Sequence, residues 1–324
     1  MKFRTEYTPR PAAFSLSPLC PVVMLGSCFS ENIAGCMRNS LWDAVNPCGT
    51  LYNPVSIANA LELFLFSESF EDDAESSLFL HTDGFWHSFL FDSKVCRMSK
   101  EETLSAIEER RKLINEKLKD AQALFITFGT SIVYALKDPQ RFSPGIVSNC
   151  HKLPSDRFSR FRMSVSEIAN LWIGLAEKIR NLFPGLNIVF TVSPVRHLKD
   201  GFEGNSHSKA VLLLAVEEIC ETLPFCSYFP AYEILNDDLR DYRFYSSDLT
   251  HPSTQAVDYI WQLFKDTYIN KEGLILLTEG EKLMKGYKHC PLVATDNQRA
   301  EYKMKVEQKL QDFLRDHPGM RFPG

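Results

Sequence analysis

The chain has 324 residues and a mass of 37.1 kDa, which is long for one domain but within the size that α/β folds reach. A net charge of −5 and a pI near 5.9 argue against binding to nucleic acid or an anionic membrane surface. Residues 1–14 lack the apolar region of a signal peptide, and no apolar stretch is long enough to cross a bilayer. Nine cysteines without CxxC pairs indicate reduced thiols, so we expect a cytoplasmic protein.

Short apolar runs alternate with helical periodicity along the chain, which is typical of a sheet covered by helices. Strands are predicted, in chain order, at 21–25, 44–46, 121–128, 187–192 and 226–232. Helices are predicted from a cap at Ser30 to about Arg38, then at 104–118, 165–182, 208–222 and 254–268. This order predicts a flavodoxin-like three-layer α/β/α sandwich with a mostly parallel sheet of about five strands.

Two stretches depart from this alternation. Residues 67–97 contain an acidic run followed by FWHSFLF, which predicts a solvated loop and a small hairpin inserted into the α/β domain of residues 1–270. Residues 271–324 have helical spacing and form a C-terminal extension. We expect this extension to pack on the domain or to join two copies in a homodimer.

Four segments lie where the carboxyl ends of the strands would meet, which is where ligands bind in such sheets. They read GSCFSENI (26–33), NPCG (46–49), FGTSIVY (128–134) and DLTHPS (248–253). The first supplies a hydroxyl or thiol at a strand-to-helix turn, and the next two supply glycines, Gly49 and Gly129, as backbone oxyanion donors. The last supplies His251, with Asp248 three residues earlier to orient the imidazole. Together they predict acyl-transfer chemistry.

The same segments resemble a known superfamily. DLTHPS resembles the DxxH block of SGNH (GDSL) hydrolases, NPCG their second block and FGTSIVY their third, while GSCFSENI stands where their nucleophile loop belongs. The GSCF opening, with NPCGTLYNP, SNCHK, TVSPVRH and DYRFY, is similar to the GSCFA-domain proteins, a bacterial branch. The matches spread over residues 22–265. The resemblance implies an SGNH-type sandwich and an esterase or acyl transferase for an O-acylated carbohydrate or envelope metabolite.

Two residues compete for the role of nucleophile. An ungapped comparison with the superfamily's loop places Cys28 at the nucleophile position and Ser27 at the preceding one. A thiol at a helix N-terminus or beside a base ionises below its ordinary pKa of about 8.5. A shift of one residue would instead make Ser27 the nucleophile, and a buried, inert Cys28 would leave no nucleophile at all.

The third block carries Ser131 where the superfamily has the asparagine that donates to the oxyanion. A serine hydroxyl donates as well, but its reach is shorter than that of an amide. Asn149 and His151, in SNCHK, are the groups that we expect to compensate. The alternative is that both are ordinary loop residues.

Further polar groups are expected near His251. Arg196 and His197 follow the fourth strand and are candidates for binding a substrate anion, with Asn205, His207 and Lys209 continuing the same segment. Arg243 and Tyr245 are candidates for the rim of the site, the alternative being that they only pack their loop.

Other chemistries lack their motifs. The histidines show no HxxxH or HExxH spacing and the cysteines no ligand spacing, so no metal is expected. GxGxxG and GxxxxGK[ST] are both missing, so no nucleotide cofactor is expected. The sequence therefore predicts an esterase or acyl transferase that uses a small-molecule or carbohydrate ester, without nucleic-acid or membrane partners. The competing hypothesis is a binding protein that keeps the fold and lacks catalysis.

Overall fold

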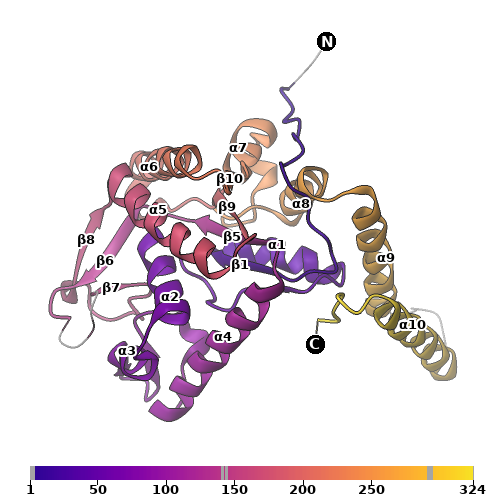
Figure 1. Cartoon of the computed structure of the whole chain (residues 1–324), viewed down its shortest axis with the longest axis horizontal. Coiled ribbons are helices and arrows are strands. Elements are labelled where there is room, and N and C mark those ends of the chain that lie inside the picture. The colour runs from indigo at the N-terminus through magenta and orange to yellow at the C-terminus, as the bar shows by residue number, and fades with distance from the viewer. Residues whose placement is uncertain (1–3, 140–141, 143–144, 290–294, 324) are drawn as a thin grey trace.

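The structure is a computed structural model that describes residues 4–139, 142, 145–289 and 295–323 (Figure 1). Its centre is a five-stranded, wholly parallel sheet in the order β2-β1-β5-β9-β10. The strands are β1 (Val22–Gly26), β2 (Ala44–Val45), β5 (Ala123–Phe128), β9 (Asn187–Val192) and β10 (Cys226–Tyr228). Counted within this sheet, the order is 2-1-3-4-5, which is the flavodoxin-like arrangement. The predicted three-layer α/β/α sandwich is confirmed.

Alternation along the strands produces the two outer layers. In β5, Leu124 and Ile126 point to one face, whereas Ala123 and Phe125 point to the other, and each set joins a separate buried cluster. The first face is covered by α2 (Pro54–Phe66), α4 (Lys100–Asp120), α5 (Val165–Leu182) and α6 (Gly201–Thr222). The second face is covered by α1 (Cys28–Asn39) and α8 (Thr254–Tyr268).

Some boundaries differ from those predicted. Helix α1 is capped by Ser27 and not by Ser30, because the Ser27 hydroxyl accepts the N–H of Phe29 at 3.3 Å. Helix α6 begins at Gly201 and not near residue 208, so Asn205 and His207 also lie on the helix. Strands β1, β5 and β9 and helices α5 and α8 lie where apolar periodicity places them.

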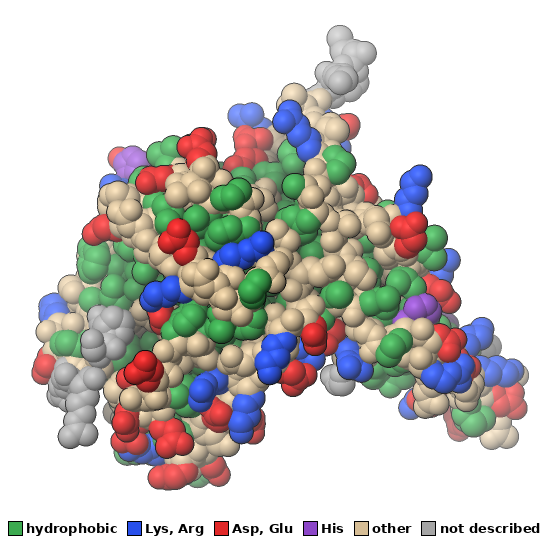
Figure 2. Space-filling view, viewed as in Figure 1, with side chains coloured by type: hydrophobic (Ala, Val, Ile, Leu, Met, Phe, Trp, Pro, Cys, Tyr) green, Lys and Arg blue, Asp and Glu red, His purple; other side chains and the backbone are tan. Residues whose placement is uncertain are grey.

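The insertion at 67–97 is partly helical. The predicted hairpin is present as β3 (Leu78–Leu80) and β4 (Trp86–Ser88). The acidic run, however, forms α3 (Phe70–Ser76), because Phe70 and Ala74 are spaced to bury one side while the acidic side chains face solvent. Acidic side chains gather over this end of the molecule, at the lower left of Figure 2.

A second, antiparallel sheet follows the central strand β5. It has the order β7-β6-β8 and consists of β6 (Ile132–Leu136), β7 (Ile146–Val147) and β8 (Phe158–Arg162). Short helical segments complete this part of the chain: η1 (Ser93–Val95), η2 (Ser155–Arg157), η3 (Leu198–Asp200), α7 (Ala231–Glu233), the π-helix η4 (Ile234–Leu239) and η5 (Tyr242–Phe244).

The C-terminal extension consists of α9 (Lys271–Lys288) and α10 (Asp296–Asp316), which project from the body of the molecule in Figure 1. Leu277 of α9 joins the buried cluster under α1 and α8. The backbone N–H of Arg321 donates to the carbonyl of Leu41 at 2.8 Å, so the chain returns to the domain after α10.

Candidate active site

The turn from β1 into α1 requires glycine at its first position. Gly26 has φ +121°, and a Cβ there would lie 2.1 Å from the carbonyl oxygen of Thr127 on β5. The N–H of Ser27 donates to that same carbonyl at 3.1 Å, and the carbonyl of Gly26 accepts the N–H of Leu51. The turn is therefore fixed by β5 on one side and by the segment after β2 on the other.

Three residues after Gly26 have structural roles. Ser27 is 1% exposed and caps the helix. Phe29 is buried in the cluster beneath α1, and the hydroxyl of Ser30 donates to Leu25 O at 3.0 Å and Thr127 Oγ1 at 2.7 Å. Cys28, the remaining residue of the GSCFS segment (26–30), is the first residue of α1 and is half-buried.

The surroundings of the Cys28 thiol act on its pKa in opposite directions. Burial is the largest effect and raises the pKa. The backbone N–H groups of Cys28 and Phe29 and the ammonium of Lys209 lower it, whereas the carboxylate of Asp248 raises it. The net result is a raised pKa, so the free protein holds a thiol that needs a base to become a nucleophile.

Lys209 is a buried cation behind the site. Its side chain is 1% exposed, and Nζ donates to the carbonyls of Gly129 (2.6 Å) and Ser193 (2.7 Å), just beyond the ends of β5 and β9. Burial lowers its pKa from 10.5 to about 7, opposed by the Cys28 thiolate. From the sequence, Lys209 was expected only as a continuation of the segment after Arg196 and His197, and its burial was not predicted, because lysine is ordinarily a surface residue.

His251 and Asp248 are joined as their spacing predicts. His251 Nδ1 and Asp248 Oδ2 are 2.6 Å apart, and Asp248 Oδ1 accepts the N–H groups of Thr250 (2.9 Å) and His251 (3.0 Å). These bonds hold the pKa of Asp248 well below its ordinary value, so it is a carboxylate. With Nδ1–H donated to it, Nε2 of a neutral His251 is an acceptor. Within the described residues, no hydrogen bond joins His251 to Cys28.

The aromatic rings of His197 and Tyr52 lie against each other next to the Cys28 thiol. The Tyr52 and His197 rings meet edge to face with centroids 5.5 Å apart. His197 Nε2 is buried and has no partner within the described part of the chain, and burial lowers the pKa of this imidazole to about 4. Burial and the nearby Cys28 raise the pKa of Tyr52. Tyr52 was not predicted as a site residue, because in the sequence it appears only within the segment NPCGTLYNP.

Arg196 lies beside the His251 loop. Its N–H donates to Thr250 O at 3.1 Å, and its guanidinium carbon lies 5.4–5.9 Å from the ring centroids of Phe202, Tyr242 and Tyr245. Within the described residues it has no carboxylate partner. The guanidinium is therefore available to an anionic ligand.

The two predicted rim residues differ in their surroundings. Tyr245 donates its hydroxyl to Asn236 Oδ1 at 3.2 Å, and its backbone pairs with Pro252, directly after His251. Arg243 is exposed and lies 3.8 Å from the carboxylate of Asp241.

The predicted oxyanion donors are engaged by other groups. Gly129 N–H donates to Tyr52 O at 2.8 Å, and the N–H and hydroxyl of Ser131 both reach Ser208 Oγ, at 2.8 and 3.1 Å. The N–H of Gly49 has a long contact of 3.4 Å with Asn46 O. An oxyanion role for these residues stays a prediction. The backbone N–H of Cys28 faces the thiol, as does that of Phe29, which also donates to Ser27 Oγ.

The structure engages Asn149 and His151 elsewhere. Asn149 Oδ1 accepts the N–H of His151 at 2.8 Å. The two ring nitrogens of the buried His151 face His87 Nδ1 at 2.9 Å and Ser88 O at 2.8 Å, away from Ser131. Their expected compensation for Ser131 is therefore not visible in the structure.

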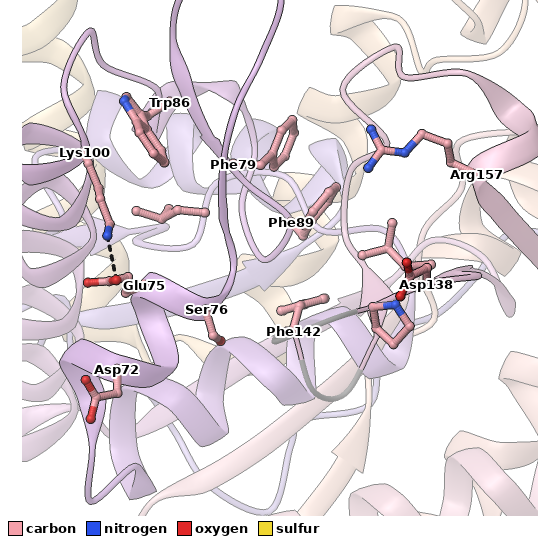
Figure 3. A pocket seen from close by; sticks show the side chains of 13 residues that line it. Asp72, Glu75, Ser76, Phe79, Trp86, Phe89, Lys100, Asp138, Phe142 and Arg157 are labelled. Carbon is pink, nitrogen blue, oxygen red and sulfur yellow. Dashed lines mark ion pairs between the residues drawn. The ribbon is translucent and has the colours of Figure 1, made fainter.

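A cavity of about 450 Å³ lies between the insertion and the small sheet (Figure 3). Its lining includes Phe79, Trp86, Lys100 and Arg157, and Lys100 pairs with Glu75 at 2.6 Å. None of the residues described around Cys28 lines it. This cavity is therefore separate from the candidate active site.

Comparison with known proteins places the chain in a family. No helix within the described ranges is long and apolar enough to cross a membrane. No curated protein matches the sequence. A family model does match, from residue 21, just before β1, to residue 264 in α8, and this span covers every loop that carries the candidate site. The chain therefore belongs to the GSCFA family.

Proposed function

We propose that this protein is an acyl-transfer enzyme, an esterase or acyl transferase, that forms a covalent intermediate on Cys28. The observation that carries the proposal is that, within GSCFS, every residue except Cys28 has a structural role. Gly26, Ser27, Phe29 and Ser30 each fill a structural role, while the Cys28 side chain stands half-buried at the helix N-terminus with polar groups around it. Because the Ser27 hydroxyl caps α1 and is almost fully buried, Cys28 is the better nucleophile.

The chemistry has two steps. In the first, His251 Nε2 takes the Cys28 proton, sulfur attacks the carbonyl carbon of an ester or thioester, and the leaving group departs with that proton. In the second, His251 removes a proton from water or an acceptor alcohol, whose oxygen attacks the thioester and releases Cys28. Asp248, a carboxylate bound to Nδ1, holds the imidazole in the required tautomer and stabilises the imidazolium.

While it is protonated, Lys209 supports the thiolate without touching the substrate. Its Nζ is held by two backbone carbonyls and lowers the pKa of Cys28 through its charge. A buried ammonium is strongly felt because little water screens it. His251 is exposed enough to exchange protons with solvent, so it serves as the base, and Lys209 is a positioning residue.

The substrate that we propose carries an anionic or strongly polar group. Arg196, surrounded by Phe202, Tyr242 and Tyr245, offers a cation next to flat aromatic faces on the side of His251. Such a surface suits a carboxylate or a polar ring. Together with the SGNH-like motifs, this supports an O-acylated carbohydrate or envelope metabolite.

Short-chain p-nitrophenyl esters and acyl thioesters test the proposal. We expect hydrolysis by the wild type, a loss of at least about 10²-fold in His251→Ala, and an acyl adduct on Cys28 by intact mass after rapid quenching. His317→Ala, a histidine at the end of α10 in the C-terminal extension, is the matched control and should keep wild-type rates. Equal rates for wild type and His251→Ala would refute the proposal.

A catalytically inactive binding protein is the second candidate. The observation that favours it is that Gly129 and Ser131 donate to other protein groups, so that fewer donors face a developing oxyanion. The two candidates differ in their response to iodoacetamide. A nucleophilic Cys28 should be alkylated faster than the more buried thiols, and His251→Ala should slow it, whereas an inert Cys28 should react alike in both proteins.

A further inference from the structure

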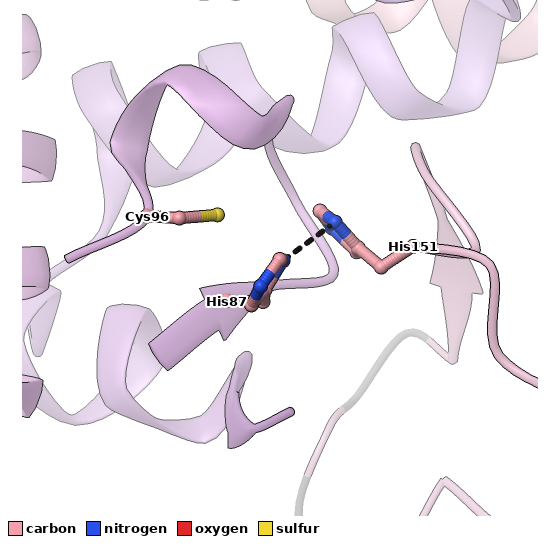
Figure 4. Close-up of side chains that lie close together, drawn as sticks. All are labelled: His87, Cys96 and His151. Carbon is pink, nitrogen blue, oxygen red and sulfur yellow. Dashed lines mark hydrogen bonds between the residues drawn. The ribbon is translucent and has the colours of Figure 1, made fainter. Parts of the chain in front are cut away.

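A second cluster of nitrogen and sulfur atoms lies away from Cys28, where the insertion meets the small sheet (Figure 4). His87 is in β4, Cys96 follows η1, and His151 follows β7. One ligand atom of each lies within 4.8 Å of those of the other two. The backbone pairing of Trp86 with Arg97 brings Cys96 beside His87. The third residue, His151, comes from a distant part of the chain.

The hydrogen bonds around the two imidazoles fix their tautomers. His151 Nε2 lies 2.8 Å from the carbonyl oxygen of Ser88, which only accepts, so this nitrogen carries the proton. His87 Nε2 lies 3.1 Å from the carboxylate of Asp83, which also only accepts. In two neutral rings, both Nδ1 atoms are then bare lone pairs.

Those two lone pairs face each other. His87 Nδ1 and His151 Nδ1 are 2.9 Å apart, in a place where both side chains are buried. Two acceptors at this distance repel each other unless a positive centre lies between or beside them. A cation or a proton between or beside these two nitrogens would therefore remove the repulsion.

We infer that His87 Nδ1, His151 Nδ1 and Cys96 Sγ form a binding site for a divalent transition-metal ion of the zinc class. Two imidazole nitrogens and a thiolate are a donor set that Zn²⁺ prefers over Mg²⁺ or Ca²⁺. Three protein ligands leave one position of a tetrahedral ion for water. On binding, the Cys96 thiol gives its proton to solvent.

The outer partners match those of known metal sites. Metal-bound histidines almost always donate their other N–H to a carboxylate or a backbone carbonyl, and here Asp83 and Ser88 supply one of each. Zn–N bonds of about 2.0–2.1 Å at a tetrahedral angle separate two nitrogens by about 3.3 Å, so the rings need to part by only a few tenths of an ångström.

The backbone also directs His151 inward. His151 and Lys152 both have positive φ, +48° and +58°, a conformation that is uncommon for residues other than glycine. The Asn149 side chain holds this turn by accepting the His151 N–H. The bend places the imidazole against His87, and an ion there would link the insertion to the loop after β7.

Cobalt(II) and zinc(II) are the probes for this site, with full-length protein freed of metal by a chelator. Titration with Co²⁺ should produce a thiolate-to-cobalt charge-transfer band that saturates at one equivalent and is removed by Zn²⁺. Cys96→Ser should lose the band, whereas Cys20→Ser, a half-buried thiol outside the cluster, should keep it. Circular dichroism before titration establishes that each variant is folded.

A second variant protects the test against misfolding. The Asp83 side chain is 46% exposed, and asparagine there still accepts the N–H of Phe85, so Asp83→Asn should fold. It should bind Co²⁺ about 10–100-fold more weakly. Zn²⁺ should raise the thermal midpoint of the wild type and not that of Cys96→Ser. No saturating band in the wild type, or the same band in Cys96→Ser, would overturn the inference and leave a proton between the rings.

Discussion

Cys28 and Cys96 are both half-buried thiols whose pKa is raised mainly by burial, yet their neighbours differ. Cys28 faces the N–H groups of a helix start and the ammonium of Lys209, which favour a thiolate. Cys96 has the carboxylates of Asp83 and Asp92 near it, which help to raise its pKa to about 11, and two imidazoles beside it. Burial alone therefore does not assign a role to a thiol. Positive surroundings favour a nucleophile, and negative or lone-pair surroundings favour a ligand for a cation.

The largest expected effect separates the two thiols directly. Cys28→Ala should lower kcat/KM for p-nitrophenyl esters by about 10³-fold or more, because the covalent route disappears. Cys96→Ala should leave kcat/KM within a few-fold of the wild type, because Cys96 lies outside the candidate active site. Steady-state kinetics of the two variants measure this contrast, and a comparable loss in both would break it.

Removing the carboxylate charge should affect activity at one of the two sites only. Asp248 binds His251 and should matter for catalysis, whereas Asp83 binds His87 and should not. Asp248→Asn should lower kcat by about 10²–10⁴-fold, because an amide in place of the carboxylate favours the wrong tautomer of His251. Asparagine Oδ1 still accepts the N–H groups of Thr250 and His251, so the loop should persist. Asp83→Asn should leave kcat unchanged. A wild-type kcat in Asp248→Asn would exclude His251 as the base.

The two regions also differ in how far the sequence predicts them. Strands such as 187–192 and the α8 helix follow from apolar periodicity, and the hydrogen bond from His251 to Asp248 follows from the DxxH spacing. Both are local features, settled within a few residues of chain. The sequence therefore predicts the sheet and one half of the candidate site well.

The remaining groups depend on contacts between distant segments. Lys209 lies in the site because α6 packs where its Nζ reaches the carbonyls beyond β5 and β9, and no local pattern marks a lysine as buried. Likewise, His87 and His151 are 64 residues apart and meet through the hairpin and the turn at His151. The acidic run was wrongly predicted as a loop, because the burial of Phe70 and Ala74 outweighs its charge.

Lys209 should make stability depend on pH. Its pKa falls from 10.5 to about 7 on folding, so between these values the unfolded chain binds a proton that the folded chain lacks, and stability rises with pH. Relative to Lys209→Met, the wild-type free energy of unfolding should gain up to about 1.4 kcal/mol per pH unit above pH 7. Urea unfolding of both proteins across this range measures the difference. A difference that does not change with pH would mean that the two carbonyls keep the ammonium charged.

The smallest expected effect concerns two serines whose hydroxyls cap helices, Ser27 at α1 and Ser99 at α4. Ser27→Ala removes the cap of α1 and should cost about 1 kcal/mol of unfolding free energy, as should Ser99→Ala, which removes the cap of α4 far from the site. Both variants should keep esterase activity within a few-fold of the wild type. If Ser27→Ala instead lost activity as Cys28→Ala is expected to, while Ser99→Ala did not, the nucleophile would be Ser27. Because Ser27 is only 1% exposed, the turn would then have to open before its hydroxyl could reach a carbonyl carbon.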